Sequence, residues 1–476
     1  MKMRIALLVC VLGMAAIIKG ENYTVDQFGV SPDFNKVNTK AIQNALDEVA
    51  QKGGGILRFE AGDYVTGTLE IPSGVGIRLD RDARILGSVN PFDYAGYAPE
   101  DNRSMSGLIS AENVSGISIS GEGTIDGRGL EVALAIDSLH HTGVRVDPGY
   151  GYRRMRPSLR PKLLDFKNVD SLKIEDVHLR GSAAWGMSLN KCRNVLVRGI
   201  DFVNRAYWNN DGIDIADCRN VLVEDCNIDS ADDGIVLKSF DPSDYNENIE
   251  IRNCEIRSSA SAFKIGTETF GGCRNVKVSG LKVFDTFRSA VALETVDGAC
   301  LENIVIDGVK AVNTGNALFM RLGHRRGDKP GSFSNVTVRN LSCDIPFGRP
   351  DSDYDLRGPD INVIHNPFPS SITGIPDARI QNVTLENIDI TYPGRGTKGM
   401  GYIAKYRLKD VPEAIEEYPE FHMFGELPAW AFYVRHVDGL NLRNVKVRKR
   451  ADDYRDAVIL DDVTGVEGKI EEATAL

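Results

Sequence analysis

The chain has 476 residues, of which 42% are hydrophobic and 26% are charged, and its formal net charge is −11. This balance excludes a disordered chain and is typical of a globular protein with one large domain or two to three ordinary ones. The sequence has no long block of basic residues, so it does not favour nucleic-acid binding.

The N-terminal segment has the pattern of a secretory signal peptide. Two basic residues precede an apolar run from Ile5 to Ile18, and the small residue Gly20 follows. We expect residues 1–20 to be removed and residues 21–476 to form a single secreted or periplasmic domain. A lipid anchor on Cys10 is disfavoured by its neighbours, and no later run approaches the ~20 apolar residues that span a bilayer.

The next recognisable element is a helix. Residues 38–50, NTKAIQNALDEVA, place their apolar side chains on one helical face, and Asn38 is suited to cap it. We expect a short amphipathic helix that covers the exposed first layer of the structure that follows, because open ends of stacked strands need such a cover.

The centre of the chain repeats itself at intervals of 26, 26, 28, 27 and 28 residues. Each unit contains about three strand-like runs separated by Asn, Gly, Asp and Ser, and its Val and Ile alternation favours strands over helices. A period of this size is typical of a solenoid. The sequence therefore predicts an all-β, right-handed parallel β-helix, in which residues one period apart lie about 4.8 Å from each other. The repeat is marked by Asn168, Asn194, Asn220, Asn248, Asn275 and Asn303, with looser copies at Asn113, Asn335 and Asn382.

Three cysteines occur in the same context, C-R-N-V, at Cys192, Cys218 and Cys273. Of the 8 cysteines, Cys10 lies in the signal segment, which leaves seven, an odd number. Two interpretations are open, an interior ladder of small apolar side chains or disulfides between coils. We favour the ladder, because sulfur packs well as a hydrophobe, and Cys192 with Cys218 is the pair to check.

One strand can be aligned across six coils. Its third and fifth positions are apolar in every copy, so they are predicted to face the core, and the alternate positions are predicted to face outward. The copies are WGMSLN at 185, DGIDIA at 211, DGIVLK at 233, SAFKIG at 261, SAVALE at 289 and NALFMR at 316.

Acidic residues gather on the outward side of these strands. Any single aspartate here has an ordinary explanation as a turn residue. Asp211, Asp232 and Asp233 together are different, because stacked carboxylates repel one another and raise the proton affinity of at least one of them. A protonated carboxylic acid beside ionised carboxylates is what glycosidic bond cleavage requires.

With these motifs the mature chain resembles glycoside hydrolase family 28, the polygalacturonase-like pectin hydrolases, over nearly its whole length. NNDGIDI is similar to the family's Asn-Thr-Asp-Gly pattern and ADDGIVLKS to its Asp-Asp pattern. The resemblance implies a secreted, inverting hydrolase that needs no cofactor, with a pectic substrate. It implies that Asp232 is the general acid and that Asp211 and Asp233 activate water, across a separation of roughly 6.5–9.5 Å.

Two departures from the family pattern concern substrate binding. Ser261 stands where the family has a histidine, and Ala292-Leu293-Glu294 replaces an Arg-Ile-Lys that grips the substrate carboxylate. Three outcomes are open. In the first, Lys264 supplies the cation that binds the substrate carboxylate, and Arg321 forms an ion pair with Glu294. In the second, arginines of an insertion supply that cation, and in the third the bound sugar is neutral. We favour a uronic-acid-containing substrate. The predicted substrate-binding residues are Asn209, Asp214, Lys238, Lys264, Glu268, Glu294 and Arg321.

Insertions are expected near residues 137–162 and 344–375, and an aromatic-rich segment near 395–436. The first carries five arginines that either reach the cleft or belong to a solvated loop. For the aromatic residues, packing on the solenoid side is favoured over stacking on sugars. The arginines are Arg145, Arg153, Arg154, Arg156 and Arg160, and the aromatic residues are Tyr418, Phe421, Phe424, Trp430, Phe432 and Tyr433.

Two other functions compete with hydrolysis. A polysaccharide lyase on the same fold would use calcium, for which Asp211, Asp214 and Asp233 offer oxygen ligands. A non-catalytic carbohydrate-binding β-helix would bind without releasing reducing ends. For the favoured hydrolase we expect a poly- or oligosaccharide partner, no metal, no membrane span and a monomer.

Overall fold

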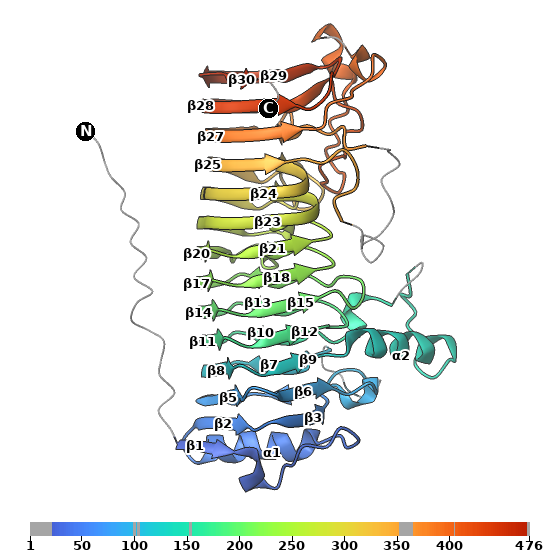
Figure 1. Ribbon diagram of the computed structural model, residues 1–476, viewed down its shortest axis with the longest axis vertical. Coiled ribbons are helices and arrows are strands. Elements are labelled where there is room, and N and C mark those ends of the chain that lie inside the picture. Colours follow the sequence, from blue (N-terminus) through green and yellow to red (C-terminus); the bar gives the residue numbers. More distant parts are fainter. Residues whose placement is uncertain are drawn as a thin grey trace, which may run out of the picture.

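The chain winds into a column of stacked parallel strands (Figure 1). The computed structural model describes residues 21–98, 101, 105–151, 155–351, 365–403 and 405–473. Every strand pairing between successive coils is parallel in these residues, as a β-helix requires. The all-β, parallel β-helix prediction is therefore confirmed.

The strands form three stacks along the column. The first is β4 (Leu69–Glu70), β7 (Ile109–Glu112), β10 (Leu164–Lys167), β13 (Met187–Asn190), β16 (Ile213–Ala216), β19 (Ile235–Ser239), β22 (Phe263–Thr269) and β26 (Ser370–Thr373). The second is β1 (Glu21–Thr24), β2 (Gly55–Phe59), β5 (Val75–Leu79), β8 (Ser115–Gly121), β11 (Asp170–Glu175), β14 (Arg193–Arg198), β17 (Arg219–Glu224) and β20 (Asn246–Arg252). The third is β3 (Gly62–Thr66), β6 (Ala83–Gly87), β9 (Thr124–Asp126), β12 (His178–Arg180), β15 (Asp201–Asn204), β18 (Asn227–Ser230) and β21 (Glu255–Ser258).

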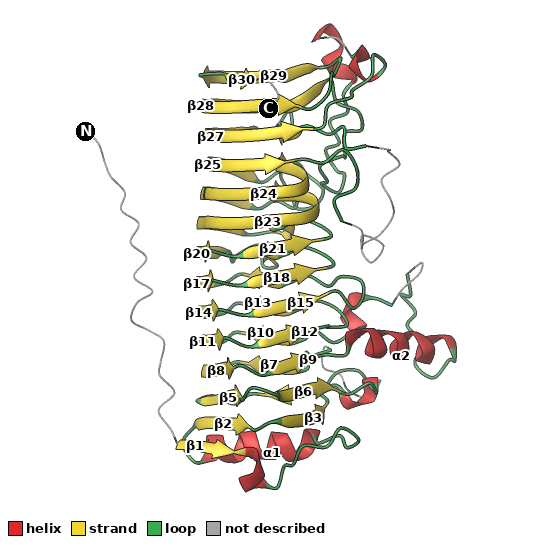
Figure 2. Cartoon of the chain, viewed as in Figure 1, coloured by secondary structure: helices red, strands yellow, loops and turns green. Residues whose placement is uncertain are grey.

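Longer strands bend from one stack into another in the C-terminal half of the column (Figure 2). They are β23 (Gly272–Thr295), β24 (Cys300–Leu322), β25 (Ser332–Asp344), β27 (Ile380–Tyr392), β28 (Ala429–Lys449) and β29 (Asp456–Glu467), and β30 (Ile470–Glu472) follows.

The first stack has the register that the sequence alignment predicts. Ile213 pairs with Met187 on one side and with Ile235 on the other, and the pattern continues through Phe263 and Val291. These residues are at most 1% exposed. Between them lies a column of alternate positions that we call the outward ladder: Glu70, Ser110, Asp165, Ser188, Asp214, Val236, Lys264, Ala292, Phe319, Ser371 and Tyr433.

The repeated asparagines form a second ladder at a bend of the coil. Each has a positive φ between 51° and 58°, a left-handed conformation that asparagine tolerates better than most residues. The side-chain amides donate from one coil to the next, for example Asn220 to Asn194 at 3.2 Å and Asn248 to Asn220 at 3.2 Å. The period of the sequence therefore corresponds to one turn of the column. At each turn, a hydrogen bond between asparagine side chains links one coil to the next.

The cysteines of the C-R-N-V motifs are buried and unbridged. Cys192, Cys218 and Cys273 are at most 1% exposed, and the described cysteines are all free thiols. The backbone N–H of Cys192 donates to Cys218 Sγ at 3.3 Å. The predicted apolar ladder is confirmed for these three positions.

Two helices and several loops leave the column. Helix α1 (Thr39–Gln51) lies at the end of the stack next to β2 and buries Ile42, Ala45, Leu46 and Val49. Helix α2 (Gly129–His141) projects from the side between β9 and β10, so the first insertion begins earlier than expected and contains a helix that the sequence pattern did not predict. In the described residues, no helix is long and apolar enough to cross a membrane.

Candidate active site

Three aspartates come together on the outer side of the first stack. Asp211 precedes β16, and Asp232 and Asp233 precede β19 on the next coil. Each is 4% exposed, and one carboxylate oxygen from each lies within 4.8 Å of the other two. The parallel winding thus brings together carboxylates that are 21 residues apart in sequence.

The spacing of these carboxylates is tighter than we expected. Inverting glycosidases typically separate acid and base by roughly 6.5–9.5 Å, whereas the closest oxygens here lie within 4.8 Å of one another. Water would be held among the three carboxylates rather than across a wide gap.

The glycines of the repeated D-G-I motif allow the coils to pack closely at this point. A Cβ on Gly212 would lie 2.4 Å from the carbonyl oxygen of Gly234, and one on Gly234 would lie 2.5 Å from that of Ala262. No side chain fits at either position without moving the backbone of the next coil. The motif therefore repeats because each aspartate is followed by a backbone contact that only glycine permits.

Burial has a strong effect on the protonation of this cluster. The pKa of Asp211 is raised well above its ordinary value, first by burial and then by the charges of Asp214 and Asp232. Burial also raises the pKa of Asp214 to about 7, although Lys238 and Lys162 oppose this shift. Within the described residues, Asp211 Oδ1 and both oxygens of Asp214 have no hydrogen-bond partner. The cluster can therefore hold a proton near neutral pH.

Asparagines fix the loop that carries Asp211. Asn204 donates to the Asp211 carbonyl at 2.7 Å, and Asn210 donates to the Ala184 carbonyl at 2.6 Å. The predicted ligand-binding residue Asn209 instead accepts a hydrogen bond from Arg160 at 2.8 Å.

The two predicted lysines lie beside the aspartates. Lys264 Nζ is 3.3 Å from Asp233 Oδ2 and 3.6 Å from Glu294 Oε2, so it bridges two carboxylates. Lys238 is 6% exposed, and the charges of Asp214 and Asp211 raise its pKa against the effect of burial. Both cations are thus present where the sequence placed them.

Glu294 lies in the site, but its predicted partner does not hold it. Burial raises the pKa of Glu294 to about 8 and outweighs the opposing charge of Lys264. Arg321 is 1% exposed and donates to the backbone carbonyls of Gly374, Glu413 and Ala414 at 2.8–3.0 Å. Arg321 donates to these carbonyls, so the alternative in which it holds Glu294 is wrong, and the cation beside Glu294 is Lys264, at 3.6 Å.

Ser261 and Glu268 contact the site or its neighbours through their backbone N–H groups. The backbone N–H of Ser261, at the family's histidine position, donates to Asp233 Oδ1 at 3.1 Å and so helps to orient that carboxylate. The backbone N–H of Glu268 donates to Asp297 Oδ2 at 2.8 Å. In the described residues, Glu268 is not part of the group of carboxylates formed by the three aspartates.

Trp185 is a site residue that the sequence analysis missed. It begins the strand copy one coil before Asp211, and its ring is half-buried between two lysines, with Lys162 Nζ at 5.2 Å and Lys238 Nζ at 5.3 Å from the ring centroid. Phe240 stacks on it with a centroid distance of 6.3 Å. A partly exposed indole beside cations and carboxylates suits a sugar ring, and its place at the head of an aligned row was the available signal.

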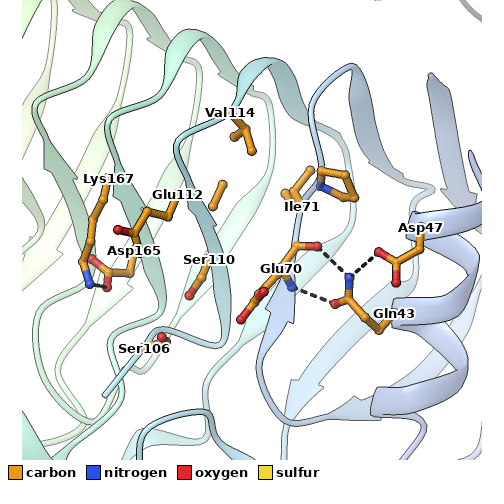
Figure 3. A pocket seen from close by; sticks show the side chains of 12 residues that line it. Gln43, Asp47, Glu70, Ile71, Ser106, Ser110, Glu112, Val114, Asp165 and Lys167 are labelled. Carbon is orange, nitrogen blue, oxygen red and sulfur yellow. Dashed lines mark hydrogen bonds and ion pairs between the residues drawn. The ribbon is translucent and has the colours of Figure 1, made fainter. Parts of the chain in front are cut away.

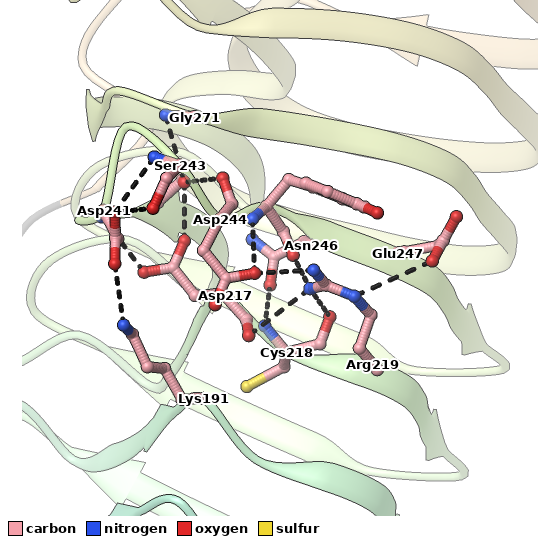
Figure 4. A network of polar contacts seen from close by, with 12 residues as sticks. Lys191, Asp217, Cys218, Arg219, Asp241, Ser243, Asp244, Asn246, Glu247 and Gly271 are labelled. Carbon is pink, nitrogen blue, oxygen red and sulfur yellow. Dashed lines mark hydrogen bonds and ion pairs between the residues drawn. The ribbon is translucent and has the colours of Figure 1, made fainter.

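A polar network holds the turn after β19 that carries Phe240 (Figure 4). Asp217 accepts hydrogen bonds from Ser239 Oγ at 2.6 Å and from the Phe240 N–H at 3.0 Å. Asn246 donates to the Lys238 carbonyl at 2.5 Å. These contacts fix the end of β19 and the position of the Phe240 ring, which stacks on Trp185.

The arginines of the first insertion bind the protein itself. Arg160 is 1% exposed and donates to the carbonyls of Ala183 and Trp208 at 2.5 Å. Arg156 pairs with Asp147, and Arg145 donates to the Tyr97 carbonyl at 3.3 Å. Arg160 therefore neither reaches the cleft nor belongs to a solvated loop. It is buried, and its hydrogen bonds stabilise the loop that carries Asn209. Arg153 and Arg154 lie outside the described residues.

The aromatic-rich segment mostly packs, as predicted. Its members Phe421, Phe424, Trp430, Phe432 and Tyr433 are at most 6% exposed. Tyr418 is the exception at 42% exposed, and its ring lies 5.7 Å from Lys264 Nζ.

The aspartate cluster also has a spacing that a cation could bridge. Of the calcium ligands considered from the sequence, Asp233 already has Lys264 at 3.3 Å, and a cation would compete with that ammonium group. The donor set therefore fits a metal less well than it fits acid and base chemistry.

A pocket of 380 Å³ lies further along the same face (Figure 3). Its lining includes Ser110 and Asp165 from the outward ladder, with Glu112 and Lys167 beside them and Gln43 from α1. The ladder therefore connects this hollow to the aspartate cluster, through the coil that carries Ser188.

Comparisons with known proteins agree with the fold. The family model for glycosyl hydrolases family 28 matches residues 88–298, which include all three aspartates. A probable polygalacturonase of Vitis vinifera is 27% identical over 289 residues, which span 56% of this chain and 56% of the grape protein. A polygalacturonase of Ralstonia nicotianae is 22% identical over 69% of this chain and 70% of its own length.

A solved structure supports the architecture. The exopolygalacturonase of Thermotoga maritima superposes with a TM-score of 0.61 at 21% identity, covering 78% of this chain and 87% of that one. At this identity the likeness concerns the fold. The family model for glycosyl hydrolases family 28 covers less than half of the chain, so the chain is similar to this family in that region.

Proposed function

We propose that the protein is a glycoside hydrolase that cleaves a pectic, uronic-acid-containing poly- or oligosaccharide with inversion at the anomeric carbon. The observation that carries the proposal is the buried meeting of Asp211, Asp232 and Asp233, whose closest oxygens lie within 4.8 Å. The match to the family model and the similarity to relatives named polygalacturonases support the substrate class.

In the proposed mechanism the cluster supplies one proton and one base. Asp232 protonates the leaving oxygen, and Asp211 and Asp233 activate the attacking water. Burial raises the pKa of Asp211 well above its ordinary value, so Asp211 is the rival candidate for the acid. Because burial and the charges of Asp214 and Asp232 raise the pKa of Asp211, this carboxyl group can hold a proton before the substrate binds.

Electrostatics supports a uronate substrate despite Glu294. With a pKa raised to about 8 by burial, Glu294 is neutral at the pH of a mildly acidic or neutral medium. It then does not repel a substrate carboxylate and can donate a hydrogen bond. Lys238 and Lys264 provide the positive charges at the aspartate cluster.

The main test is the release of reducing ends from polygalacturonate and rhamnogalacturonan by the wild type and by Asp232→Asn. We expect the variant to lose about 10²–10⁴-fold in kcat, the usual contribution of a general acid. Asp170→Asn, an exposed aspartate on β11, is the matched control and should keep wild-type activity. Wild-type turnover by Asp232→Asn, with an unchanged circular dichroism spectrum, would contradict the acid assignment.

The same assay separates the two competing functions. A calcium-dependent lyase would lose activity with a chelator and give an unsaturated product that absorbs ultraviolet light. A binding protein would retain polysaccharide without releasing reducing ends. The stereochemistry of the first product, followed by proton NMR, tests inversion directly.

Three finer features belong to the same proposal. We propose a right-handed column, since parallel crossover connections almost always have that hand. We propose that α1 caps it, because four apolar side chains of the helix are buried next to β2. The pattern of residues 1–20 supports export from the cytoplasm.

A further inference from the structure

We propose that the substrate groove is closed at its C-terminal end, so that the enzyme removes units from a chain end rather than cutting inside the chain. The inference rests on the proposed function as a glycoside hydrolase. It concerns residues 411–428, which we call the wall segment.

The outward ladder is covered beyond Lys264. Of the next four outward positions, three carry the apolar side chains of Ala292, Phe319 and Tyr433. They belong to a separate apolar cluster with Phe421, Phe424 and Leu427 of the wall segment, whereas their neighbours in the strands face the main core. A polysaccharide lying on the aspartates therefore cannot continue over these coils.

Buried arginines fix the wall segment to the column. Arg321 donates to the carbonyls of Glu413 and Ala414, and Arg435 donates to the Val411 carbonyl at 3.0 Å and pairs with Glu413. The N–H of His324 donates to the Ile415 carbonyl at 2.8 Å. With Arg321 1% and Arg435 8% exposed, these bonds are protected from water, so the wall is a fixed part of the fold.

The side of the wall that faces the aspartates is polar. The Tyr418 ring lies 5.7 Å from Lys264 Nζ and 5.2 Å from the Arg325 guanidinium, and Tyr418 Oη is 3.5 Å from Thr267 Oγ1. Glu420 pairs with Arg288. An aromatic ring, cations and a carboxylate at the end of a groove suit the ring and hydroxyl groups of a terminal sugar.

The other direction offers a longer path. From the coil of Asp233, only two steps of the ladder, roughly 10 Å, lead to the covered Ala292. Towards the N-terminus, four steps lead from Asp214 through Ser188 and Asp165 to Ser110 and Glu70, where the 380 Å³ pocket lies. The wall segment is therefore closer to the aspartates along the ladder than the pocket on the other side is.

The test is the product profile of the wild type on polygalacturonate and on oligogalacturonates labelled at the reducing end. We expect one short product class from the first time point, with a slow fall in viscosity per bond cleaved. The label identifies the end that is attacked. A mixture of oligosaccharides with a rapid fall in viscosity would overturn the closed groove while leaving the hydrolase proposal standing; no cleavage of any pectic glycan would contradict the hydrolase proposal itself.

A wall variant sharpens this test. Tyr418→Ala combined with Glu420→Ala removes the polar tip but leaves the buried anchors, and we expect longer products to appear beside the short one. Tyr406→Ala, at a tyrosine that is 84% exposed outside the wall segment, is the control and should keep the wild-type profile. In a folded variant with intact activity, a profile identical to the wild type would contradict the role of the wall tip in chain-end selection.

Discussion

The outward ladder has opposite properties at its two ends. From Asp165 to Lys264 its residues are mostly polar and lie beside the aspartate cluster, whereas from Ala292 to Tyr433 they are mostly apolar and pack with the wall segment. The inward residues of the same strands are mostly apolar. The comparison teaches that the inward pattern specifies the column, and that the outward pattern decides where a ligand can lie.

The largest expected effect is a loss of activity when an aspartate at the polar end of the ladder is replaced. Asp211→Asn should lower kcat by about 10²–10⁴-fold on pectic substrates. If Asp211 acts as base, its variant stays inactive on an aryl glycoside with a good leaving group, and Asp232→Asn regains activity there because no acid is needed. The opposite pair of results would assign the acid to Asp211.

At the covered end, the expected effect is on stability. Phe319→Ala removes a ring from the cluster under the wall segment and should lower the free energy of unfolding by about 3–5 kcal/mol. Urea denaturation measures this, with Phe284→Ala, a 37% exposed ring on the neighbouring strand β23, as the matched control. Equal and small losses in both variants would show that the wall does not bury the ladder.

Glu294 lies where the two ends meet, and its effect should depend on pH. Burial raises the pKa of Glu294 from its ordinary value of 4.5 to about 8 in the folded protein. The stability that comes from its neutral form is therefore present at low pH and is lost as the pH rises from 4.5 through about 8. Glu294→Gln should therefore gain stability relative to the wild type above pH 8 and gain little near pH 5. A Tm difference that does not change with pH would contradict a buried, neutral Glu294.

The smallest expected effect concerns Trp185 on the open side of the aspartates. Trp185→Ala should raise KM by up to about tenfold with little change in kcat, since ring stacking contributes about 0.5–1.5 kcal/mol. Steady-state kinetics on oligogalacturonates of increasing length measures this. A fall in kcat at unchanged KM would instead mean that the indole positions Lys238 for the reaction.

Much of the column and of its acidic site could be predicted from the sequence because both follow from a local period. The repeated D-G-I pattern aligned Ile213 with Ile235, although these residues are closer in sequence than successive asparagines of the repeat. The same alignment predicted the meeting of Asp211 and Asp233. Each of these steps depends only on the next coil.

The parts that escaped prediction depend on contacts without a period. Arg321 binds the carbonyl of Ala414, 93 residues away, and no pattern in the sequence links the two. Arg321 pairs with Glu294 in the strand register, which suggested an ion pair between them. In the structure, its guanidinium instead donates hydrogen bonds to backbone carbonyls of the wall segment. Helix α2 escaped because its N-cap residue, Arg128, is in a left-handed conformation and makes no side-chain cap bond.

The attachment of the wall segment through its carbonyl oxygens has a consequence for divergence within such enzymes. Arg321 and Arg435 recognise atoms that every amino acid possesses, so substitutions at Tyr418 or Glu420 leave the attachment intact. The tip can therefore change its preferred sugar through ordinary point mutations, while the arginines keep the barrier in place.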